Sequence, residues 1–321
     1  MALLTPITDD DARALLAAYG IEPLVTLEPL AAGSVNSNFA LHAGERRLFL
    51  RIYEERDAAA AEAEAAMVER LAAAGVPTPA PLRRLDGGLV SRVRGKPAAL
   101  LPWREGTIRR QSQVTTDDTR RLGEALARVH VAGAREPREP GRFRYPDLCA
   151  RLDRAAASAD PRFEQHLPAL RDALASAHAA RPPLPRGLIH GDLFRDNVLW
   201  KEGGDLAALL DFDSASDGTF AYDLMVTVLA WCVGDDLDTG LARALREGYE
   251  RVRPLEEAEK RGLAAEGAFA SLRFAVTRIT DFAMRTVPGG PPPARDWRRF
   301  MMRFAKLQGL GEAGVRAALG A

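Results

Sequence analysis

A polar loop between two apolar strands, followed at once by a hairpin, constrains the fold of this 321-residue chain more than any other segment. Residues 190–197 form the polar loop, and the apolar run at 198–200 leads into Glu202-Gly203-Gly204-Asp205, a typical hairpin turn. The return strand then delivers Asp211 beside Asn197, at the end of the loop. The sequence therefore predicts that the polar side chains of this segment converge at one place.

Three of these side chains fit the chemistry of phosphoryl transfer. In that reaction one aspartate accepts the proton of the attacking hydroxyl, while an asparagine and a second aspartate hold Mg²⁺ on the phosphates of ATP. Asp192 is the candidate base, and Asn197 and Asp211 are the candidate metal ligands, because Mg²⁺ prefers hard oxygen donors. The alternative is that Asp192 and Asn197 only cap a loop, which is a common use of both residue types.

The composition is that of an ordinary globular protein, with 47% hydrophobic and 27% charged residues, and the length suggests two lobes. Lys and Arg number 44 and Asp and Glu number 44, so no overall field would recruit nucleic acid or a membrane surface. A small-molecule substrate is therefore expected. Two distant cysteines, no basic leader and no apolar run of spanning length predict a cytoplasmic protein.

The first hundred residues predict a small lobe built on antiparallel strands. A helix at 9–19 is followed by strands at 25–31, 39–42 and 48–53. The loop between the first two strands carries Gly33, Ser34 and Asn36, which are suited to laying N–H groups and a hydroxyl over ATP phosphates. A plain hairpin loop is the alternative, because one glycine is a weaker signal than a full glycine-rich motif.

The third strand carries one charge, Arg51, where an ATP-binding small lobe places the cation that pairs with phosphates. Arginine in place of the commoner lysine keeps the charge and offers bidentate geometry. The next helix, at 58–74, provides Glu62 and Glu64 as partners for Arg51, and Glu64 is favoured. An exposed arginine at a sheet edge and glutamates on a solvated helix face are the alternatives.

A change of pattern near residue 102 predicts a hinge. Strands near 88–93 and 98–101 are followed by Pro102-Trp103-Arg104-Glu105-Gly106, which breaks the alternation. Backbone groups around Leu101 and Trp103 are the predicted contacts for the adenine edge, because ligands tend to lie between domains. The predicted organisation is a nucleotide-binding lobe at 1–101, a hinge at 102–106 and a helical catalytic and substrate lobe at 107–321.

Beyond the hinge the hydrophobic periodicity is helical. Helices are predicted at 116–133, 145–157, 163–180, 222–233, 239–251, 256–285 and 295–310. His130 lies against an apolar stripe and is expected to be structural, and His190 is expected to support the loop rather than transfer protons. Asp223 has two interpretations, capping its helix or bracing the catalytic loop, and capping is favoured.

The assembled pattern resembles the aminoglycoside phosphotransferase and choline kinase superfamily, and within it the bacterial homoserine kinases. This resemblance implies an α+β, protein-kinase-like two-lobed fold, with a small antiparallel-sheet N-lobe and a mainly helical C-lobe. Its stretches span nearly the whole chain and include Gly33-Ser34-Val35-Asn36-Ser37-Asn38, Leu50-Arg51-Ile52-Tyr53, Asp192-Leu193-Phe194-Arg195-Asp196-Asn197-Val198, Ala230-Trp231-Cys232 and Arg251-Val252-Arg253-Pro254. Three positions depart from the homoserine kinase pattern: Arg51, Gly191 and Asp213 stand where that family has Thr, Ala and an aromatic residue.

The resemblance implies transfer of the γ-phosphoryl group of ATP to the side-chain hydroxyl of L-homoserine, a step of threonine biosynthesis, with Mg²⁺ as cofactor. The three departures look more like the general superfamily, so a kinase for another small alcohol or amine, such as an aminoglycoside, choline or thiamine, is the alternative. An inactive nucleotide-binding module is less favoured, because such a module has no need of Asp192, Asn197 and Asp211 together. No oligomeric state is predicted.

An amino-acid acceptor needs a cation for its carboxylate and an anion for its ammonium group. The helix at 256–285 offers Arg273, Thr277 and Asp281 at successive i,i+4 steps, with Arg278 one position round. An internal ion pair on a surface face is the alternative. The next predicted helix is strongly basic and would suit a polycationic aminoglycoside poorly if it faces the cleft, and the aromatic content of 7% argues against a choline cage.

Overall fold

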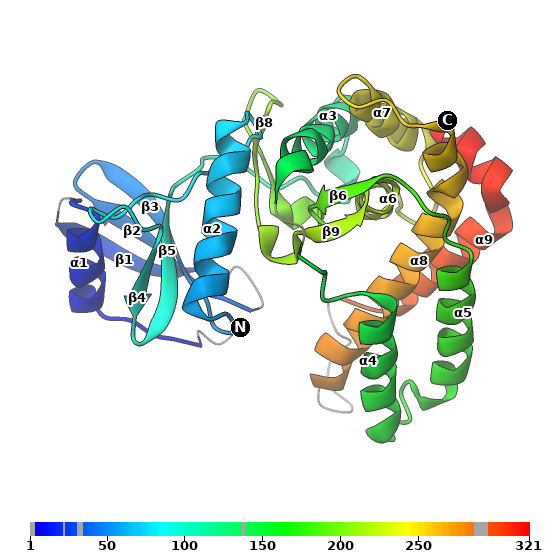
Figure 1. Cartoon of the computed structure of the whole chain (residues 1–321), viewed down its shortest axis with the longest axis horizontal. Coiled ribbons are helices and arrows are strands. Elements are labelled where there is room, and N and C mark those ends of the chain that lie inside the picture. Colours follow the sequence, from blue (N-terminus) through cyan, green and yellow to red (C-terminus); the bar gives the residue numbers. More distant parts are fainter. Residues whose placement is uncertain (1–3, 22, 31–34, 137–138, 286–294) are drawn as a thin grey trace. The chain divides into compact units, whose positions relative to one another are not determined.

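The computed structural model describes residues 4–21, 23–30, 35–136, 139–285 and 295–321, which form two compact units (Figure 1). Unit 1 comprises Met1–Thr107 and Val198–Asp213, and unit 2 comprises Ile108–Asn197 and Ser214–Ala321. The hairpin after the catalytic loop thus belongs with the N-terminal residues, whereas the predicted lobes placed it with the C-terminal ones. Backbone hydrogen bonds account for this, because Leu209 donates to Pro77 over 2.6 Å and Thr107 pairs with Trp200.

Unit 1 is an antiparallel five-stranded sheet with the strand order β1-β2-β3-β5-β4 and two helices. Its elements are α1 (Asp9–Ala18), β1 (Leu24–Leu30), β2 (Ser37–Ala43), β3 (Arg46–Ile52), α2 (Ala58–Ala73), β4 (Val90–Val93) and β5 (Lys96–Pro102). The expected helices and strands of the small lobe are therefore present. The predicted phosphate loop falls partly outside the described residues, because 31–34 are not among them.

Strand alternation places Arg51 on the α2 side of the sheet. Leu50 and Ile52 belong to the apolar cluster that also contains the buried face of α1. Arg51 lies between them in sequence and pairs with Ala99, which packs in the second cluster with Ala61 and Ala65 of α2. Arg51, the predicted partner of the ATP phosphates, thus faces α2, the helix that carries Glu62 and Glu64.

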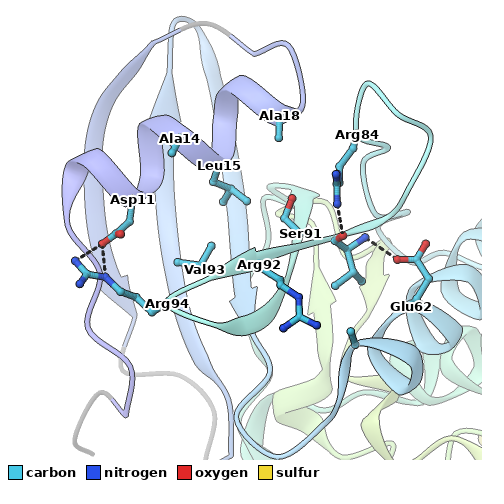
Figure 2. A pocket seen from close by; sticks show the side chains of 12 residues that line it. Asp11, Ala14, Leu15, Ala18, Glu62, Arg84, Ser91, Arg92, Val93 and Arg94 are labelled. Carbon is cyan, nitrogen blue, oxygen red and sulfur yellow. Dashed lines mark hydrogen bonds and ion pairs between the residues drawn. The ribbon is translucent and has the colours of Figure 1, made fainter.

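A groove of about 600 Å³ lies between α1 and β4, and residues of α2 form part of its lining (Figure 2). Glu62 lies on one wall, and its carboxylate accepts the N–H groups of Leu89 and Val90, each over 2.9 Å. On the far wall Arg94 contacts Asp11. Glu62 therefore ties α2 to β4, and this position on the helix excludes it as the partner of Arg51 in this structure.

Unit 1 also contains the predicted hairpin, formed by β7 (Val198–Trp200) and β8 (Leu206–Leu209). Val198 pairs with Leu209 in antiparallel register. Asn197 immediately precedes Val198 in the chain, and Asp211 follows Leu209 by two residues. The predicted hairpin is thus present.

Unit 2 is mainly helical. Its elements are α3 (Thr116–Ala132), α4 (Tyr145–Ala157), α5 (Leu167–Ala179), β6 (Arg186–Ile189), β9 (Ser216–Thr219), α6 (Phe220–Trp231), α7 (Thr239–Glu250), α8 (Glu257–Asp281) and α9 (Arg298–Leu319). Short 3₁₀ turns lie at Gln111–Gln113, Gly133–Arg135, Glu164–His166, Arg195–Asn197 and Ala283–Arg285 in this unit, and Phe212–Ser214 joins the two units in sequence. No helix among the described residues is both long enough and apolar enough to cross a bilayer.

The sequence missed one strand of unit 2 and misplaced the end of one helix. Strand β9 was not predicted, because its sequence, Ser-Asp-Gly-Thr, lacks apolar alternation. The strand is held instead by pairing with β6. The last helix was predicted to end at Leu310 but continues to Leu319, with a break at Gly311, whose φ is 62°. Glycine adopts this left-handed backbone readily, so the chain turns there and re-enters a helix.

Helices α3 and α7 cross so closely that only glycine fits at two positions. A Cβ atom on Gly123 would lie 2.0 Å from the carbonyl oxygen of Leu245, and one on Gly248 would lie 1.9 Å from that of Arg120. These obstacles are backbone atoms, which cannot rotate away. The two helices therefore pack backbone against backbone.

Replacing Gly248 by alanine should lower the free energy of unfolding by about 3 kcal/mol, the upper end of the cost of overpacking. Gly309 in α9 is the matched control, because an added Cβ there meets no atom within 4 Å. Gly309→Ala should instead raise stability by about 0.5–1 kcal/mol through helix propensity. Urea unfolding followed by tryptophan fluorescence compares the two variants, and equal effects would contradict the close crossing.

Candidate functional site

Arg51 lies within a cluster of charged side chains in unit 1. Its Nη1 atom is 3.0 Å from Oδ1 of Asp213, 3.3 Å from Oδ1 of Asp211 and 3.8 Å from Oε1 of Glu64. Burial opposes the charge on Arg51, but Asp213, Asp211 and Glu64 together outweigh it and raise the pKa of the guanidinium. Arg51 is therefore a permanent cation surrounded by carboxylates.

Glu64 is the glutamate of α2 that contacts Arg51, as the sequence favoured. It is buried, and its second oxygen lies 3.1 Å from Nη1 of Arg56. Burial and the nearby Asp213 carboxylate raise the pKa of Glu64 to about 7, against the opposing pull of Arg51 and Arg56. Two guanidiniums thus share three carboxylates in this cluster.

Two of the three departures from the homoserine kinase pattern contact each other. Arg51 donates to the side chain of Asp213, and Arg56 donates to the backbone carbonyl of Asp213 over 2.7 Å. Asn36, from the predicted phosphate loop, donates to Oδ2 of Asp213 over 2.8 Å. An arginine and an aspartate thus stand together where that family pattern has two uncharged residues.

This pairing predicts strong coupling between the two positions. Arg51→Met and Asp213→Asn should each destabilise the protein, but the double variant should recover about 1–3 kcal/mol relative to the sum, because losing Arg51 costs less once residue 213 is uncharged. Thermal and urea unfolding of the four proteins gives this coupling energy. Additivity to within about 0.5 kcal/mol would show that the two side chains do not stabilise each other.

Asp211 follows β8 in a left-handed conformation, with φ at 62°. This conformation costs a residue other than glycine about 1–2 kcal/mol, although aspartate tolerates it better than most. Its side chain is 38% exposed, the most exposed of the carboxylates around Arg51. Backbone strain of this kind is concentrated at functional sites, and it presents a carboxylate to solvent here.

The other residues predicted to bind the nucleotide differ in what the structure shows. Gly33 and Ser34 lie outside the described residues. Leu101 lies in β5 opposite Phe49. The N–H group of Trp103 donates to the carbonyl of Arg47 over 3.2 Å, and the Arg47 guanidinium lies 3.7 Å from the centre of the Trp103 ring. The backbone donor of Trp103 is therefore already engaged within unit 1.

The predicted catalytic loop, residues 190–197 in unit 2, is held by a buried carboxylate, that of Asp223. Its two oxygens accept the backbone N–H groups of His190 and Gly191 over 2.7 and 2.8 Å. The favoured interpretation of Asp223 as a helix cap was wrong. α6 begins at Phe220, so Asp223 lies inside the first turn, and its carboxylate is directed at the loop.

His130 and Tyr249 complete the support behind this carboxylate. Nε2 of His130 lies 3.0 Å from Oδ2 of Asp223, and Nδ1 lies 2.7 Å from the hydroxyl of Tyr249. Burial lowers the pKa of His130, so the neutral ring donates from Nε2 and accepts at Nδ1. Burial opposes the charge on Asp223, but the hydrogen bonds from His130 and Gly191 hold the pKa of Asp223 below its usual range.

Asp192 and Asn197 are linked across the catalytic loop. Nδ2 of Asn197 donates to the carbonyl of Asp192 over 2.8 Å, which leaves the amide oxygen of Asn197 as its ligand atom. His190 is fully buried and accepts the N–H group of Asp192 at Nδ1 over 3.3 Å. Gly191 has a φ of 74°, and a Cβ there would lie 2.9 Å from the carbonyl of Ser214. Glycine thus suits a position that would be strained for alanine.

The four residues proposed for the acceptor fall into two groups. Nη1 of Arg273 lies 3.4 Å from Oδ1 of Asp192, and the guanidinium lies between the rings of Phe143 and Phe274. Thr277 is buried and donates to the helix carbonyl of Phe274. Asp281 is instead paired with Arg151 of α4.

Arg278 is largely buried beside α9, and its Nη1 donates to the carbonyl of Asp296 over 3.1 Å. Only Arg273 of the four thus touches the candidate base directly. Asp281 is ion-paired, but with Arg151 of α4 rather than with an arginine of its own helix, as the alternative interpretation had it.

The chain of hydrogen bonds from Tyr249 to the loop predicts a pH dependence of stability. The unfolded histidine titrates near 6.5 and the folded one below it, so the unfolded chain binds the extra proton. The free energy of unfolding should therefore fall as the pH drops below about 6.5, by at most about 1.4 kcal/mol per pH unit from this group. Urea unfolding at pH 7.5 and 5.5 measures the slope, which should be smaller for His130→Gln. Equal slopes in both proteins would show that His130 is not the source of the pH dependence.

The comparisons with known proteins place this arrangement in a family. Residues 26–255 match the model of the phosphotransferase enzyme family, and the chain belongs to that family. It is an alcohol-accepting phosphotransferase similar to homoserine kinases. A homoserine kinase of Rhizobium rhizogenes is 35% identical over 297 residues, with 90% of each chain covered. One from Rhizobium etli is 33% identical over 318 residues, with 98% of each chain covered.

Solved structures show the same protein-kinase-like fold. Amicoumacin kinase hAmiN in complex with AMP-PNP, Ca²⁺ and Ami has a TM-score of 0.68 at 14% identity, covering 94% of this chain and 92% of that one. The choline kinase LicA of Streptococcus pneumoniae has a TM-score of 0.66 at 13% identity, covering 94% and 99%. The expected α+β fold, with a small antiparallel sheet and a mainly helical remainder, is thus confirmed.

Sequence reasoning missed several residues of these two clusters. Asp213 was noted only as a departure, although the run Asp-Phe-Asp placed it two residues after a predicted ligand. Arg56 ends the stretch 50–56 that carries the family resemblance but was given no role. Tyr249 lies 119 residues from His130, its hydrogen-bond partner, so no local spacing connects them.

Proposed function

We propose that this small-molecule kinase transfers the γ-phosphoryl group of ATP to the side-chain hydroxyl of L-homoserine, a step of threonine biosynthesis. The observation that carries the reaction type is the loop in which buried Asp223 fixes His190 and Gly191 beside Asp192. The choice of homoserine is supported by relatives named homoserine kinases, which match along nearly the whole chain.

Asp192 is the candidate base that orients the acceptor hydroxyl and takes its proton. Its side chain is 30% exposed, so a substrate can reach it, and Arg273 holds one of its oxygens. Phosphoryl transfer requires little covalent help from the protein, and catalysis depends mainly on positioning and on charge. A carboxylate fixed through its own backbone by His190 and Asn197 provides that positioning.

The donor atoms present fit Mg²⁺ that arrives with the nucleotide. No three His, Cys, Asp or Glu side chains in the described part of the chain are grouped to hold a metal by themselves. Mg²⁺ is commonly held by one or two carboxylates together with substrate phosphates. The amide oxygen of Asn197 and the exposed carboxylate of Asp211 are the oxygens that would hold it, and the bound ion would neutralise charge on the phosphates. AMP-PNP and Ca²⁺ are bound in the similar amicoumacin kinase.

Arg51 is the candidate cation for the ATP phosphates. In the structure its guanidinium is shared among Asp211, Asp213 and Glu64. A phosphate that approaches Asp211 with its metal would compete for this guanidinium, since arginine pairs with phosphates bidentately. Glu64, whose Oε1 lies 3.8 Å from Nη1 of Arg51, would then keep the guanidinium in place.

Asp192→Asn should lower kcat for ADP release by at least about a thousandfold, because the amide cannot accept the proton and its contacts otherwise persist. The dissociation constant for ATP should change little. Asp196→Asn is the matched control on the same loop, since its side chain is 53% exposed and should leave kcat near that of the wild type.

The acceptor is tested in the same assay with L-homoserine, choline, thiamine, an aminoglycoside and related amino alcohols. Preference for homoserine supports the proposal. Turnover of another acceptor alone would keep the kinase and reject homoserine, and activity that survives in Asp192→Asn would reject the assigned base.

A further inference from the structure

Three phenylalanine rings form a contiguous cluster beside the catalytic loop of unit 2. Phe194 comes from that loop, Phe274 from α8 and Phe300 from α9. The centre of the Phe274 ring lies 4.9 Å from that of Phe194 and 5.0 Å from that of Phe300, while Phe194 and Phe300 are 6.2 Å apart. This phenylalanine cluster joins Asp192, two residues before Phe194, to the two helices.

Two guanidiniums lie on the Phe300 ring of this cluster. Arg278 is 4.4 Å and Arg303 is 4.5 Å from the ring centre. Each donates one hydrogen bond to a backbone carbonyl, Arg278 to Asp296 and Arg303 to Val233, both over 3.1 Å. Within the described residues neither has a carboxylate at ion-pair distance. Most of the N–H groups on these two guanidiniums are thus left without a protein acceptor.

The charge around this pair is unbalanced. Burial, together with Arg303, Arg295 and Arg299, lowers the pKa of Arg278 to about 10 against the opposing effect of the Asp192 carboxylate. Burial and the neighbouring Arg195 and Arg299 do the same for Arg303. Buried like charges destabilise a fold unless something of opposite sign is bound. Such an arrangement is suited to an anion from outside the chain.

We infer that Arg278 and Arg303 bind the carboxylate group of the phosphoryl acceptor. This inference rests on the proposed function, which it deepens by assigning the residues that select an amino-acid acceptor. The spacing of five residues turns Arg278 about 140° around α8 from Arg273, so the link to the base runs through the phenylalanine cluster. The Asp192 carboxylate also acts electrostatically on Arg278. A four-carbon acceptor with its carboxylate on the pair would then direct its hydroxyl to Asp192.

A carboxylate is favoured over a nucleotide phosphate as the occupant. The cationic partner of phosphates in this fold is expected on β3, and Arg51 occupies that position. The same pair of cations would repel a polycationic acceptor such as an aminoglycoside. Binding of the nucleotide phosphate is an outcome of the experiment below.

The test compares Arg303→Met and Arg278→Met with the wild type on two acceptors. L-homoserine carries the carboxylate, and 3-amino-1-propanol is the same molecule without it. Methionine keeps the packing on Phe300 but removes the charge. Arg298→Met is the matched control, because Arg298 lies on the same helix with a side chain that is 57% exposed.

The expected result is a loss of about 10- to 100-fold in kcat/KM for homoserine in both variants, the effect of a lost charge-assisted hydrogen bond. The values for 3-amino-1-propanol and the KM for ATP should not change, and Arg298→Met should behave as the wild type. An equal loss on both acceptors would mean that the pair is only structural. A rise in the KM for ATP alone would assign the pair to the nucleotide.

Sulfate probes the same pair without turnover. Sodium sulfate should raise the melting temperature of the wild type and Arg298→Met more than that of Arg303→Met, with sodium chloride at equal ionic strength as reference. If the wild type does not phosphorylate homoserine but shows this difference, the proposed acceptor fails and the anion site stands. If homoserine is turned over and Arg303→Met matches the wild type in both assays, the anion site is wrong.

Discussion

One buried carboxylate, that of Asp223, organises the catalytic half of unit 2. It accepts hydrogen bonds from the backbone of His190, the backbone of Gly191 and the ring of His130. A desolvated charge that loses one of its donors costs about 1–3 kcal/mol, so these groups stabilise one another. The loop that carries Asp192 is therefore fixed from behind, by α3 and α6, rather than by its own contacts with solvent. Its geometry thus rests on hydrogen bonds within the protein.

In unit 1, ion pairs hold the candidate nucleotide-binding side chains in place. Alternation in β3 turns Arg51 toward α2, where Glu64 is buried, and the hairpin brings Asp211 and Asp213 to the same guanidinium. Glu64, whose pKa is about 7, is shared with Arg56, and Asp211 is the most exposed of the three carboxyl groups. A metal–nucleotide complex would supply both the cation for Asp211 and the anion for Arg51. The charged side chains of this cluster thus suit a ligand that carries both a positive and a negative group.

Much of this was predictable from the sequence, because local patterns determine most of it. The single charge in the third strand identified Arg51, with Glu64 favoured as its partner, and the Gly-Gly turn predicted the hairpin that leads to Asp211. The direction of the Asp223 carboxylate was not predictable, since it depends on a loop 32 residues away. Strand β9 was not evident from the sequence, because it is held by pairing with β6. The ion pair of Asp281 was not evident either, because its partner Arg151 comes from a separate helix.

The most direct test of phosphoryl transfer to homoserine is the identity of the product. Phosphorus NMR of the protein with ATP, Mg²⁺ and L-homoserine should show a phosphomonoester resonance that grows in step with ADP and is split by the adjacent CH₂ protons. Asp192→Asn should show neither signal. Growth of inorganic phosphate in place of the phosphomonoester, or no ADP at all, would contradict the proposed reaction.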